Sequence, residues 1–233
     1  MDDVIKRAAV FVDLDGTLCE IYLWQGIFSH HRTNRFKLGA LYSFIAFHFP
    51  IWLLYEAKVV SKEFFYKLHA TNLAWLLKDV SIARADVIWD WVIEHQILPR
   101  IRPEMVDEIN THKGIGRRIY LISGSFSPIL DRLVTSMKLA GAIATPLEVR
   151  NGQYTGRIIP PLNVGHGKVE RLRQFLDNQD ELIQLSNSYF YTDSYVDMPV
   201  MELFGHPIAV YPDKLLAAEA KKHGWTTIGT NES

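Results

Sequence analysis

Short uncharged runs that alternate with longer helical segments constrain the fold of this chain more than any other feature. Buried strands are predicted at residues 8–13, 118–123, 189–192 and 207–211. Helices are predicted for most of residues 22–94 and at 102–113, 128–138 and 167–176. Short buried strands separated by helices indicate an α/β fold, with a parallel sheet and helices on both faces. A hairpin is predicted at residues 147–159, because Asn151-Gly152 is a favoured turn pair.

Composition excludes several classes of protein. The 233 residues carry a net charge of −1 at pH 7, whereas a nucleic-acid-binding protein would be basic. Disorder is excluded because 48% of the residues are hydrophobic and 12% are aromatic. The single cysteine, Cys19, rules out an internal disulfide or a cysteine-rich zinc site, and we expect it to be a packing residue. The acidic N-terminal residues show no signal peptide, so we expect a cytoplasmic protein.

Acidic pairs follow two of the predicted strands. Asp13 and Asp15 follow the first strand, and Asp193 and Asp197 follow the strand at 189–192. In a parallel sheet, ligands bind beyond the carboxyl ends of the strands. One carboxylate of a pair could be a nucleophile or metal ligand, and the other a general acid and base. For Asp13 and Asp15 taken alone, a solvated turn is the alternative.

Groups suited to a phosphate follow the second predicted strand. Ser123 offers a hydroxyl and Gly124 a free backbone N–H. The alternative is that Ser125 or Ser127 caps the next helix. Lys168 lies near the start of a later predicted helix, where a solvated lysine is the alternative. Together with the acidic pairs, these residues would form a crevice for a divalent cation and a phosphate.

The sequence resembles the haloacid dehalogenase (HAD) superfamily over nearly its whole length. The motifs that carry the resemblance are, in chain order, Asp13-Leu14-Asp15-Gly16-Thr17-Leu18, Ile122-Ser123-Gly124-Ser125, Lys168 and Asp193-Ser194-Tyr195-Val196-Asp197. The chain is most similar to the phosphoserine-phosphatase-like branch, subfamily IB, in which a helical cap is inserted between the first two motifs. The resemblance implies a Rossmann-like parallel-sheet core at residues 1–19 and 100–233 and an α-helical cap domain at residues 20–99.

The resemblance also implies a catalytic mechanism with Mg²⁺ as the cofactor. Asp13 would be the nucleophile that attacks phosphorus and forms an aspartyl-phosphate. Asp15 would protonate the leaving group and later activate water. The metal ligands would be the Asp13 carboxylate, the Asp15 carbonyl and Asp193. A cation and a lysine are needed because a carboxylate and a phosphate repel each other.

The remaining site residues would bind the substrate phosphate or support the residues that do. By resemblance, Ser123 and the N–H of Gly124 would hold a phosphoryl oxygen. Thr17 would help to position it, and Lys168 would neutralise its charge. Asp197 would orient Lys168 or a metal-bound water, as residues behind the ligands commonly do.

Two departures from the family pattern argue against phosphoserine as the substrate. Phosphoserine phosphatases have an acidic residue nine positions beyond the nucleophile that binds the substrate amine. In this sequence Tyr22 stands there, with Glu20 two residues earlier. The last motif lacks its usual Gly and Asn residues, and Thr192, Ser194 and Val196 stand in their places.

The most apolar part of the predicted cap is residues 38–55, which contain no Asp, Glu, Lys or Arg. This length is at the lower limit for a membrane span, but Pro50 would kink or end a helix there. We therefore favour ordinary buried helices. The alternatives are peripheral contact with a membrane surface through residues 32–55, where basic residues flank the apolar run, and a true span.

Aromatic and histidine side chains of the predicted cap have two interpretations. The aromatic residues concerned are Trp24, Phe28, Tyr42, Phe44, Phe47, Trp52 and Tyr55. We favour packing within the cap, because large aromatic side chains are usually buried, and the alternative is a subsite for a larger or more apolar leaving group. His30 and His31 are expected to lie in an exposed loop.

These observations predict a Mg²⁺-dependent phosphomonoesterase that acts on a small phosphorylated substrate. One alternative is a membrane-surface phosphatase for lipid phosphates of the phosphatidylglycerophosphate or lysophosphatidate type. A second alternative is a non-catalytic module that binds a phosphate or a partner, because a fold does not determine a function. The complete set of Asp13, Asp15, Ser123, Lys168 and Asp193 argues against the non-catalytic alternative.

Overall fold

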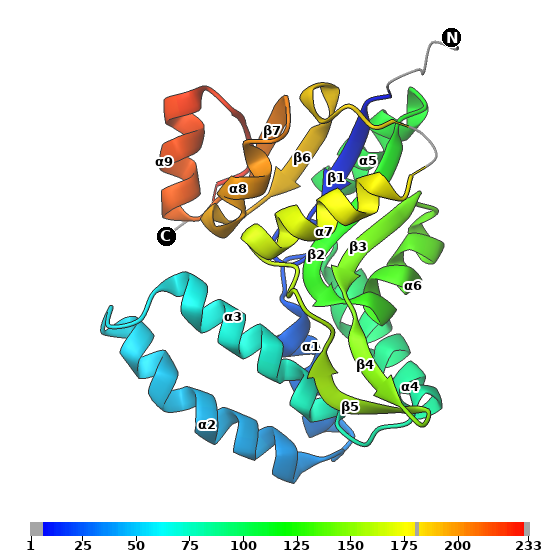
Figure 1. Ribbon diagram of the computed structural model, residues 1–233, viewed down its shortest axis with the longest axis vertical. Helices are drawn as coiled ribbons and strands as arrows, with labels where there is room; N and C mark the ends of the chain where they lie inside the picture. The colour runs from blue at the N-terminus through cyan, green and yellow to red at the C-terminus, as the bar shows by residue number, and fades with distance from the viewer. Residues whose placement is uncertain (1–6, 180–181, 231–233) are drawn as a thin grey trace.

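A parallel sheet forms the centre of the computed structural model, which describes residues 7–179 and 182–230. Its strand order is β3-β2-β1-β6-β7-β8 (Figure 1). The strands are β1 (Ala9–Val12), β2 (Arg118–Phe126), β3 (Gly141–Thr145), β6 (Tyr189–Thr192), β7 (His206–Val210) and β8 (Thr226–Ile228). Every neighbouring pair in this sheet is parallel. The predicted Rossmann-like α/β fold is confirmed.

Helices cover both faces of the sheet, and β1 is therefore buried on both sides. Ala9 and Phe11 pack in one hydrophobic cluster and Val10 and Val12 in the other, as the alternation of side chains along a strand requires. The first cluster includes side chains of α7 (His166–Asp177), α8 (Met198–Met201) and α9 (Lys214–His223). The second includes side chains of α5 (Pro103–Gly114) and α6 (Ser127–Met137).

The edges of the sheet and the end of β2 differ from the prediction. The outer strands β3 and β8 were not expected, since β3 is short and mostly made of small residues and β8 has three residues. Strand β2 continues to Phe126, three residues beyond its predicted end, and its register with β3 shifts between Ile122 and Phe126. Ser123 and Ser125 therefore belong to an irregular strand end, and neither Ser125 nor Ser127 caps α6, whose N-cap is Phe126.

The inserted segment between β1 and β2 is helical, as expected. It contains α1 (Leu23–Thr33), α2 (Leu38–Glu56), α3 (Lys62–Asn72), a 3-10 helix (Leu73–Leu77), α4 (Ile82–Val92), a π-helix (Ile93–Ile97) and a short 3-10 turn (Leu98–Arg100). One hydrophobic cluster runs from the sheet through Leu18 and Ile27 to Leu77 and Trp89. The buried core is thus continuous between sheet and insert, and the division into two domains at residues 20–99 stays a prediction.

The predicted hairpin is present as β4 (Leu147–Arg150) and β5 (Gln153–Ile158), and it packs against the inserted helices. Asn151 and Gly152 both have positive φ, as a two-residue turn requires. The N–H of Tyr154 donates to the carbonyl of Val80, and the N–H of Asp79 donates to the carbonyl of Tyr154. Backbone hydrogen bonds therefore tie the insert to the core at a second place.

Helix α2 contradicts the expectation of ordinary buried helices. It is one continuous helix from Leu38 to Glu56, and it is the helix among the described residues that is long and apolar enough to cross a membrane. Only 17% of its apolar window is buried. Pro50 does not end the helix. Proline has no backbone N–H to donate to the carbonyl of Ala46, and both residues lie on the exposed side of α2.

The aromatic side chains of the insert divide into two groups, which corrects the expectation that they only pack together. Phe44 is buried, and Phe28 contacts it edge to face. Large exposed fractions are found instead at Trp24, Tyr42, Phe47 and Trp52. Burial of large aromatics is a tendency of residue type, whereas the side of its helix on which each one lies decides its exposure here.

His30 and His31 are buried in the last turns of α1, so the predicted exposed loop is wrong. His30 is 4% exposed and His31 is fully buried. The ring of His30 lies edge to face with Trp91 and Phe36, and a ring nitrogen of His31 lies 3.3 Å from the carbonyl of Leu76. These positions continue the apolar side of α1 that begins with Ile27.

Burial of His30 predicts a loss of stability at acidic pH. Burial, with the neighbouring His31, lowers the pKa of His30 from 6.5 to about 4. As the pH falls below 6.5 the unfolded chain takes up this proton before the folded chain does. The contribution of neutral His30 to the free energy of unfolding is therefore complete above pH 6.5. It is lost toward pH 4, by about 3 kcal/mol at most. Urea unfolding at neutral and acidic pH should show a smaller pH effect in His30→Phe than in the wild type; equal effects would contradict the assignment.

Candidate active site

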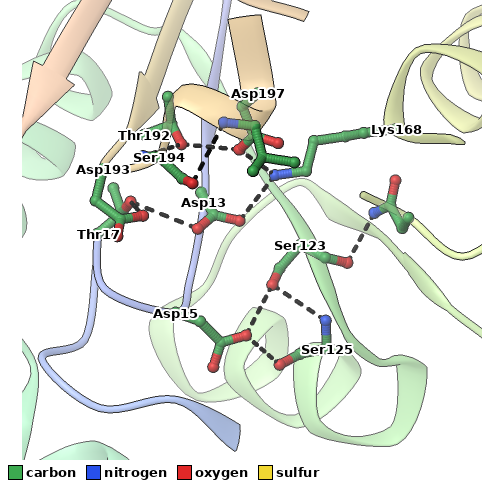
Figure 2. A network of polar contacts seen from close by, with 12 residues as sticks. Asp13, Asp15, Thr17, Ser123, Ser125, Lys168, Thr192, Asp193, Ser194 and Asp197 are labelled. Atoms are coloured by element: carbon green, nitrogen blue, oxygen red, sulfur yellow. Dashed lines mark hydrogen bonds and ion pairs between the residues drawn. The ribbon is translucent and has the colours of Figure 1, made fainter. Parts of the chain in front are cut away.

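A buried lysine joins the carboxylates that follow two neighbouring strands. The Nζ of Lys168 lies 3.0 Å from Oδ1 of Asp13 and 2.6 Å from Oδ2 of Asp197, and all three side chains are buried (Figure 2). Asp13 directly follows β1, and Asp197 ends a 3-10 turn just after β6. The hydroxyl of Thr192 also donates to Oδ2 of Asp197, at 2.8 Å. The predicted convergence on Lys168 is therefore present, and the solvated alternative for this lysine is wrong.

The carboxylate of Asp193 lies on the other side of Asp13. The hydroxyl of Thr17 donates to Oδ1 of Asp193 at 3.1 Å and lies 3.5 Å from Oδ2 of Asp13. The phenol of Tyr22 donates to Oδ2 of Asp193 at 3.3 Å. In this structure Thr17 thus contacts the two carboxylates. Glu20, by contrast, is exposed and lies 3.6 Å from Arg102, away from these carboxylates.

Asp15 forms a second group with the end of β2, below Asp13 in Figure 2. Its Oδ2 accepts hydrogen bonds from the hydroxyls of Ser123, at 3.2 Å, and Ser125, at 2.5 Å. Its Oδ1 accepts a hydrogen bond of 2.6 Å from the backbone N–H of Leu23, the first residue of α1. Three donors therefore orient this carboxylate, one of them from the inserted segment, and the solvated-turn alternative is wrong.

Burial of several carboxylates around one lysine shifts their pKa values. Burial raises the pKa of Asp13 well above its usual range, and Lys168 opposes this shift. Burial, with the charge of Asp197, raises the pKa of Asp193 to about 7. Burial also raises the pKa of Asp15, although its hydrogen bonds oppose the shift. Several carboxyl groups thus share one lysine, and a bound cation would favour their ionised forms.

The residues present fit a Mg²⁺ ion. Asp13 and Asp193 are close enough to share the Thr17 hydroxyl, and they are hard oxygen ligands. Gly16, with φ of +83°, passes so near Asp193 that a Cβ there would overlap its carboxylate. No group of three His, Cys, Asp or Glu side chains among residues 7–179 and 182–230 is arranged to hold a metal. Two carboxylates with the Asp15 carbonyl suffice for Mg²⁺, which keeps several waters.

A cavity of about 480 Å³ extends from these polar residues into the inserted segment. The side chains at its polar end are Asp13, Asp15, Ser123, Ser125, Lys168, Asp193 and Asp197. Its other walls are mostly aromatic and come from α1, α2 and α3, among them Trp24, Phe28, Trp52, Phe65 and His69. The site thus combines a polar end suited to a phosphate with a large apolar chamber.

Three side chains of the site were not among those predicted to act in it. Ser125 stands beside Ser123 in the second motif, but the helix-cap interpretation kept it out of the predicted site. Tyr22 was noted only as a departure from the family pattern. Asn163 donates from its amide to the carbonyls of Ser123 and Ile143, at 2.7 Å each, and no local pattern marks it. Its contacts depend on the pairing of β2 with β3 (residues 141–145), which the sequence did not predict.

Cys19 behaves as the packing residue that was expected. It is buried in the hydrophobic cluster, and its Sγ lies 3.6 Å from the carbonyl of Ile97. Burial raises the pKa of its thiol to about 11. Such a thiol stays protonated at neutral pH and is a poor nucleophile.

Comparison with known proteins agrees with this geometry. The family model described as haloacid dehalogenase-like hydrolase matches residues 10–202, which include every acidic motif of the site. The chain belongs to this family. A histidinol-phosphatase from Neisseria meningitidis is 31% identical to this HAD hydrolase over 176 residues, which cover 75% of this chain and 78% of the relative. The chain is therefore a HAD-type phosphatase, and the non-catalytic alternative is not favoured.

Solved structures share the fold of this HAD hydrolase. A protein of unknown function from Bordetella pertussis Tohama I superposes with a TM-score of 0.80 and 24% identity, covering 97% of this chain and 99% of that protein. A phosphoserine phosphatase in its apo form gives a TM-score of 0.65 and 17% identity, with 96% and 94% covered. Both likenesses support the fold rather than a particular substrate.

The close approach of Gly16 to the Asp193 carboxylate predicts that the Gly16→Ala variant loses activity selectively. Gly16→Ala places a methyl group against the Asp193 carboxylate, so Asp193 must move. Gly116→Ala is a matched control, because Gly116 also has positive φ, +78°, but open space around it. We expect both variants to lose about 1 kcal/mol of stability, from backbone strain. Only Gly16→Ala should lose most of its aryl-phosphatase activity; equal activity in the two variants would contradict this role.

Proposed function

We propose that this HAD hydrolase is a Mg²⁺-dependent phosphomonoesterase that works through an aspartyl-phosphate on Asp13. The observation that carries the proposal is the contact of Asp13 with Lys168 at one end of a cavity that also contains Asp15. The nucleophile Asp13, the charged Lys168 and the candidate acid Asp15 then surround one place for a phosphate. The similarity to a phosphatase from Neisseria meningitidis supports the same chemistry.

In the first step, an oxygen of Asp13 forms a bond to phosphorus while the bond from phosphorus to the leaving oxygen breaks. The leaving oxygen takes a proton from Asp15. The raised pKa of Asp15 suits this role, because its carboxyl then keeps a proton to a higher pH than an exposed one. Lys168 and the hydroxyl of Ser123 would hold the phosphoryl oxygens and offset their charge.

In the second step, Asp15 is ionised and takes a proton from a water molecule. The oxygen of this water forms a bond to phosphorus, and the bond from phosphorus to Asp13 breaks. Phosphate leaves, and both carboxyl groups regain their starting states. Hydrogen bonds from Leu23, Ser123 and Ser125 orient the Asp15 carboxyl in the structure before substrate is present. This preorganisation lowers the cost of both proton transfers.

Mg²⁺ would be held by the carboxylates of Asp13 and Asp193 and by the carbonyl of Asp15. When bound, it supplies positive charge that favours the ionised nucleophile and withdraws charge from the phosphate. Thr17 and Tyr22 would keep the Asp193 carboxylate in place through their hydroxyl groups. Asp197 would hold Lys168, since their separation is the shorter of the two ion pairs of this lysine.

Removal of the nucleophile provides the first test of this proposal. Asp13→Asn has the same shape, but its amide is a poor nucleophile and cannot form the acyl phosphate, so hydrolysis of an aryl phosphate should fall at least about a thousandfold. Steady-state kinetics with Mg²⁺ measure the change. Asp131→Asn, which alters an exposed carboxylate on α6, should keep full activity. Undiminished hydrolysis by Asp13→Asn would refute the assignment of the nucleophile.

Metal binding can be tested through both activity and thermal stability. A chelator should abolish hydrolysis, and added Mg²⁺ should restore it and raise the melting temperature of the protein. At a hundredfold excess over the dissociation constant, stabilisation by the ion is about 2.7 kcal/mol. Asp193→Asn should fold but lose most of this thermal shift. If the shift were the same in Asp193→Asn and the wild type, Asp193 would not be a ligand.

A further inference from the structure

Helix α2 has one side that packs against the protein and one that is largely exposed. Leu41, Phe44 and His48 are buried, at spacings of three and four residues, and they define the packed side. The other side exposes large apolar side chains, namely Tyr42, Phe47, Phe49, Leu53 and Leu54. A soluble monomer seldom exposes so many apolar side chains together, so this side marks an interaction surface.

The charges near α2 indicate which partner fits this surface. Residues 21–61 contain four basic side chains, Arg32, Arg35, Lys37 and Lys58, and one acid, Glu56. Arg32 and Arg35 are exposed before the helix begins, and Lys58 is exposed just after it ends. An apolar helix side bordered by cations and by tyrosine and tryptophan is the pattern of a segment that lies on an anionic lipid surface.

The same surface borders the mouth of the active-site cavity. Ile45, Phe49 and Trp52 of α2 line the cavity and are also exposed, as is Trp24 of α1. Figure 1 shows α2 on the outer side of α3, at the end of the molecule beyond β1 and β2. A molecule that enters the cavity past Phe49 therefore crosses the apolar surface of α2.

Among the described residues, no Asp, Glu, Lys or Arg lines the far end of the cavity, where a charged leaving group would need a partner. The charged residues that line the cavity all lie at its phosphate end, namely Asp13, Asp15, Lys168, Asp193 and Asp197. His48 uses one ring nitrogen at the Phe44 carbonyl, 2.8 Å away, and the other at the amide of Asn72, 3.2 Å away. An ammonium or carboxylate group placed among these walls would be buried without an opposite charge, at a large cost.

We propose that the exposed side of α2 lies on an anionic lipid bilayer and that the cavity takes a lipid phosphate monoester from that surface. The inference rests on the proposed phosphatase function and adds the surface and the substrate class. The phosphate group reaches Lys168 and Asp13, and the apolar part of the lipid lies along Phe49 and Trp52. Hydrolysis breaks the bond from phosphorus to the lipid oxygen, which takes the proton from Asp15.

Packing of α2 explains why it would lie on the bilayer rather than cross it. Leu41 and Phe44 contact the rest of the insert, and Asn72 of α3 bonds to His48. A span would have to break these contacts and carry the His48 ring of α2 into hydrocarbon without its Asn72 partner, which is costly. A helix in the plane of the interface keeps its packed side on the protein and buries only the opposite side in lipid.

Vesicle sedimentation tests the docking surface. The full chain should sediment with vesicles of phosphatidylcholine and about 25 mol% phosphatidylglycerol, and less with phosphatidylcholine alone. A double variant, Leu53→Glu with Leu54→Glu, should bind at least about tenfold more weakly, because two apolar side chains become charged. Neither Leu53 nor Leu54 lines the cavity, so the double variant should hydrolyse a soluble aryl phosphate as fast as the wild type does. Leu215→Glu, which alters an equally exposed leucine on α9, should bind vesicles as the wild type does.

Phosphatidate in the same vesicles tests the substrate class. The wild type should hydrolyse it at least about tenfold better, in kcat/KM, than phosphoserine or glycerol phosphate, and the double variant should lose this advantage. If the enzyme hydrolyses aryl phosphate but does not bind vesicles, or if α2 forms a dimer interface instead of binding lipid, the inference is overturned. The proposed function would still stand. Vesicle binding without hydrolysis of any phosphate would instead refute the proposed function. Preference for the soluble phosphates by a vesicle-bound enzyme would overturn the substrate class.

Discussion

Lys168 holds the carboxylates of Asp13 and Asp197 at 3.0 and 2.6 Å in a place where all three side chains are buried. Burial alone would lower the pKa of Lys168, but Asp13 and Asp197 raise it above its usual value, so the lysine stays charged. A buried charge is tolerated only when it is paired, and Lys168 and its two partners come from three separate elements. The start of α7 and the ends of β1 and β6 must therefore meet, which the parallel sheet order provides.

The two ends of the active-site cavity have opposite chemical character. The strand ends supply carboxylates, hydroxyls and one lysine, whereas α1, α2 and α3 supply aromatic and aliphatic walls. Asp15 connects the two ends, because its carboxylate accepts hydrogen bonds from Ser123 of the sheet and from the N–H of Leu23 of the insert. Movement of α1 would thus change the environment of the residue proposed to transfer the proton. Phosphate chemistry and recognition of the leaving group are separate in space but joined at Asp15.

Much of the fold could be predicted because its signals are local. Buried strands next to acidic residues, and the Asn151-Gly152 turn, are recognisable within a few residues. Strand β3 and the exposed side of α2 could not be predicted in this way, because each depends on what packs beside it. The buried state of His30 is of the same kind, since Trp91 and Phe36 create it from other parts of the chain. Local pattern indicates a helix or strand, whereas burial is a property of neighbours.

By itself the sequence determined the family, the order of the motifs and the residue types at Asp13, Asp15 and Lys168, because reaction chemistry restricts these types strongly. Only the tertiary structure decided the partners of Asp15 and the place of Tyr22, since hydrogen bonds form between groups that lie far apart along the chain. It also decided that α2 is exposed, because residues 38–55 are apolar on all sides and their composition does not indicate which side packs. The contacts of Leu41, Phe44 and His48 with the insert make that choice.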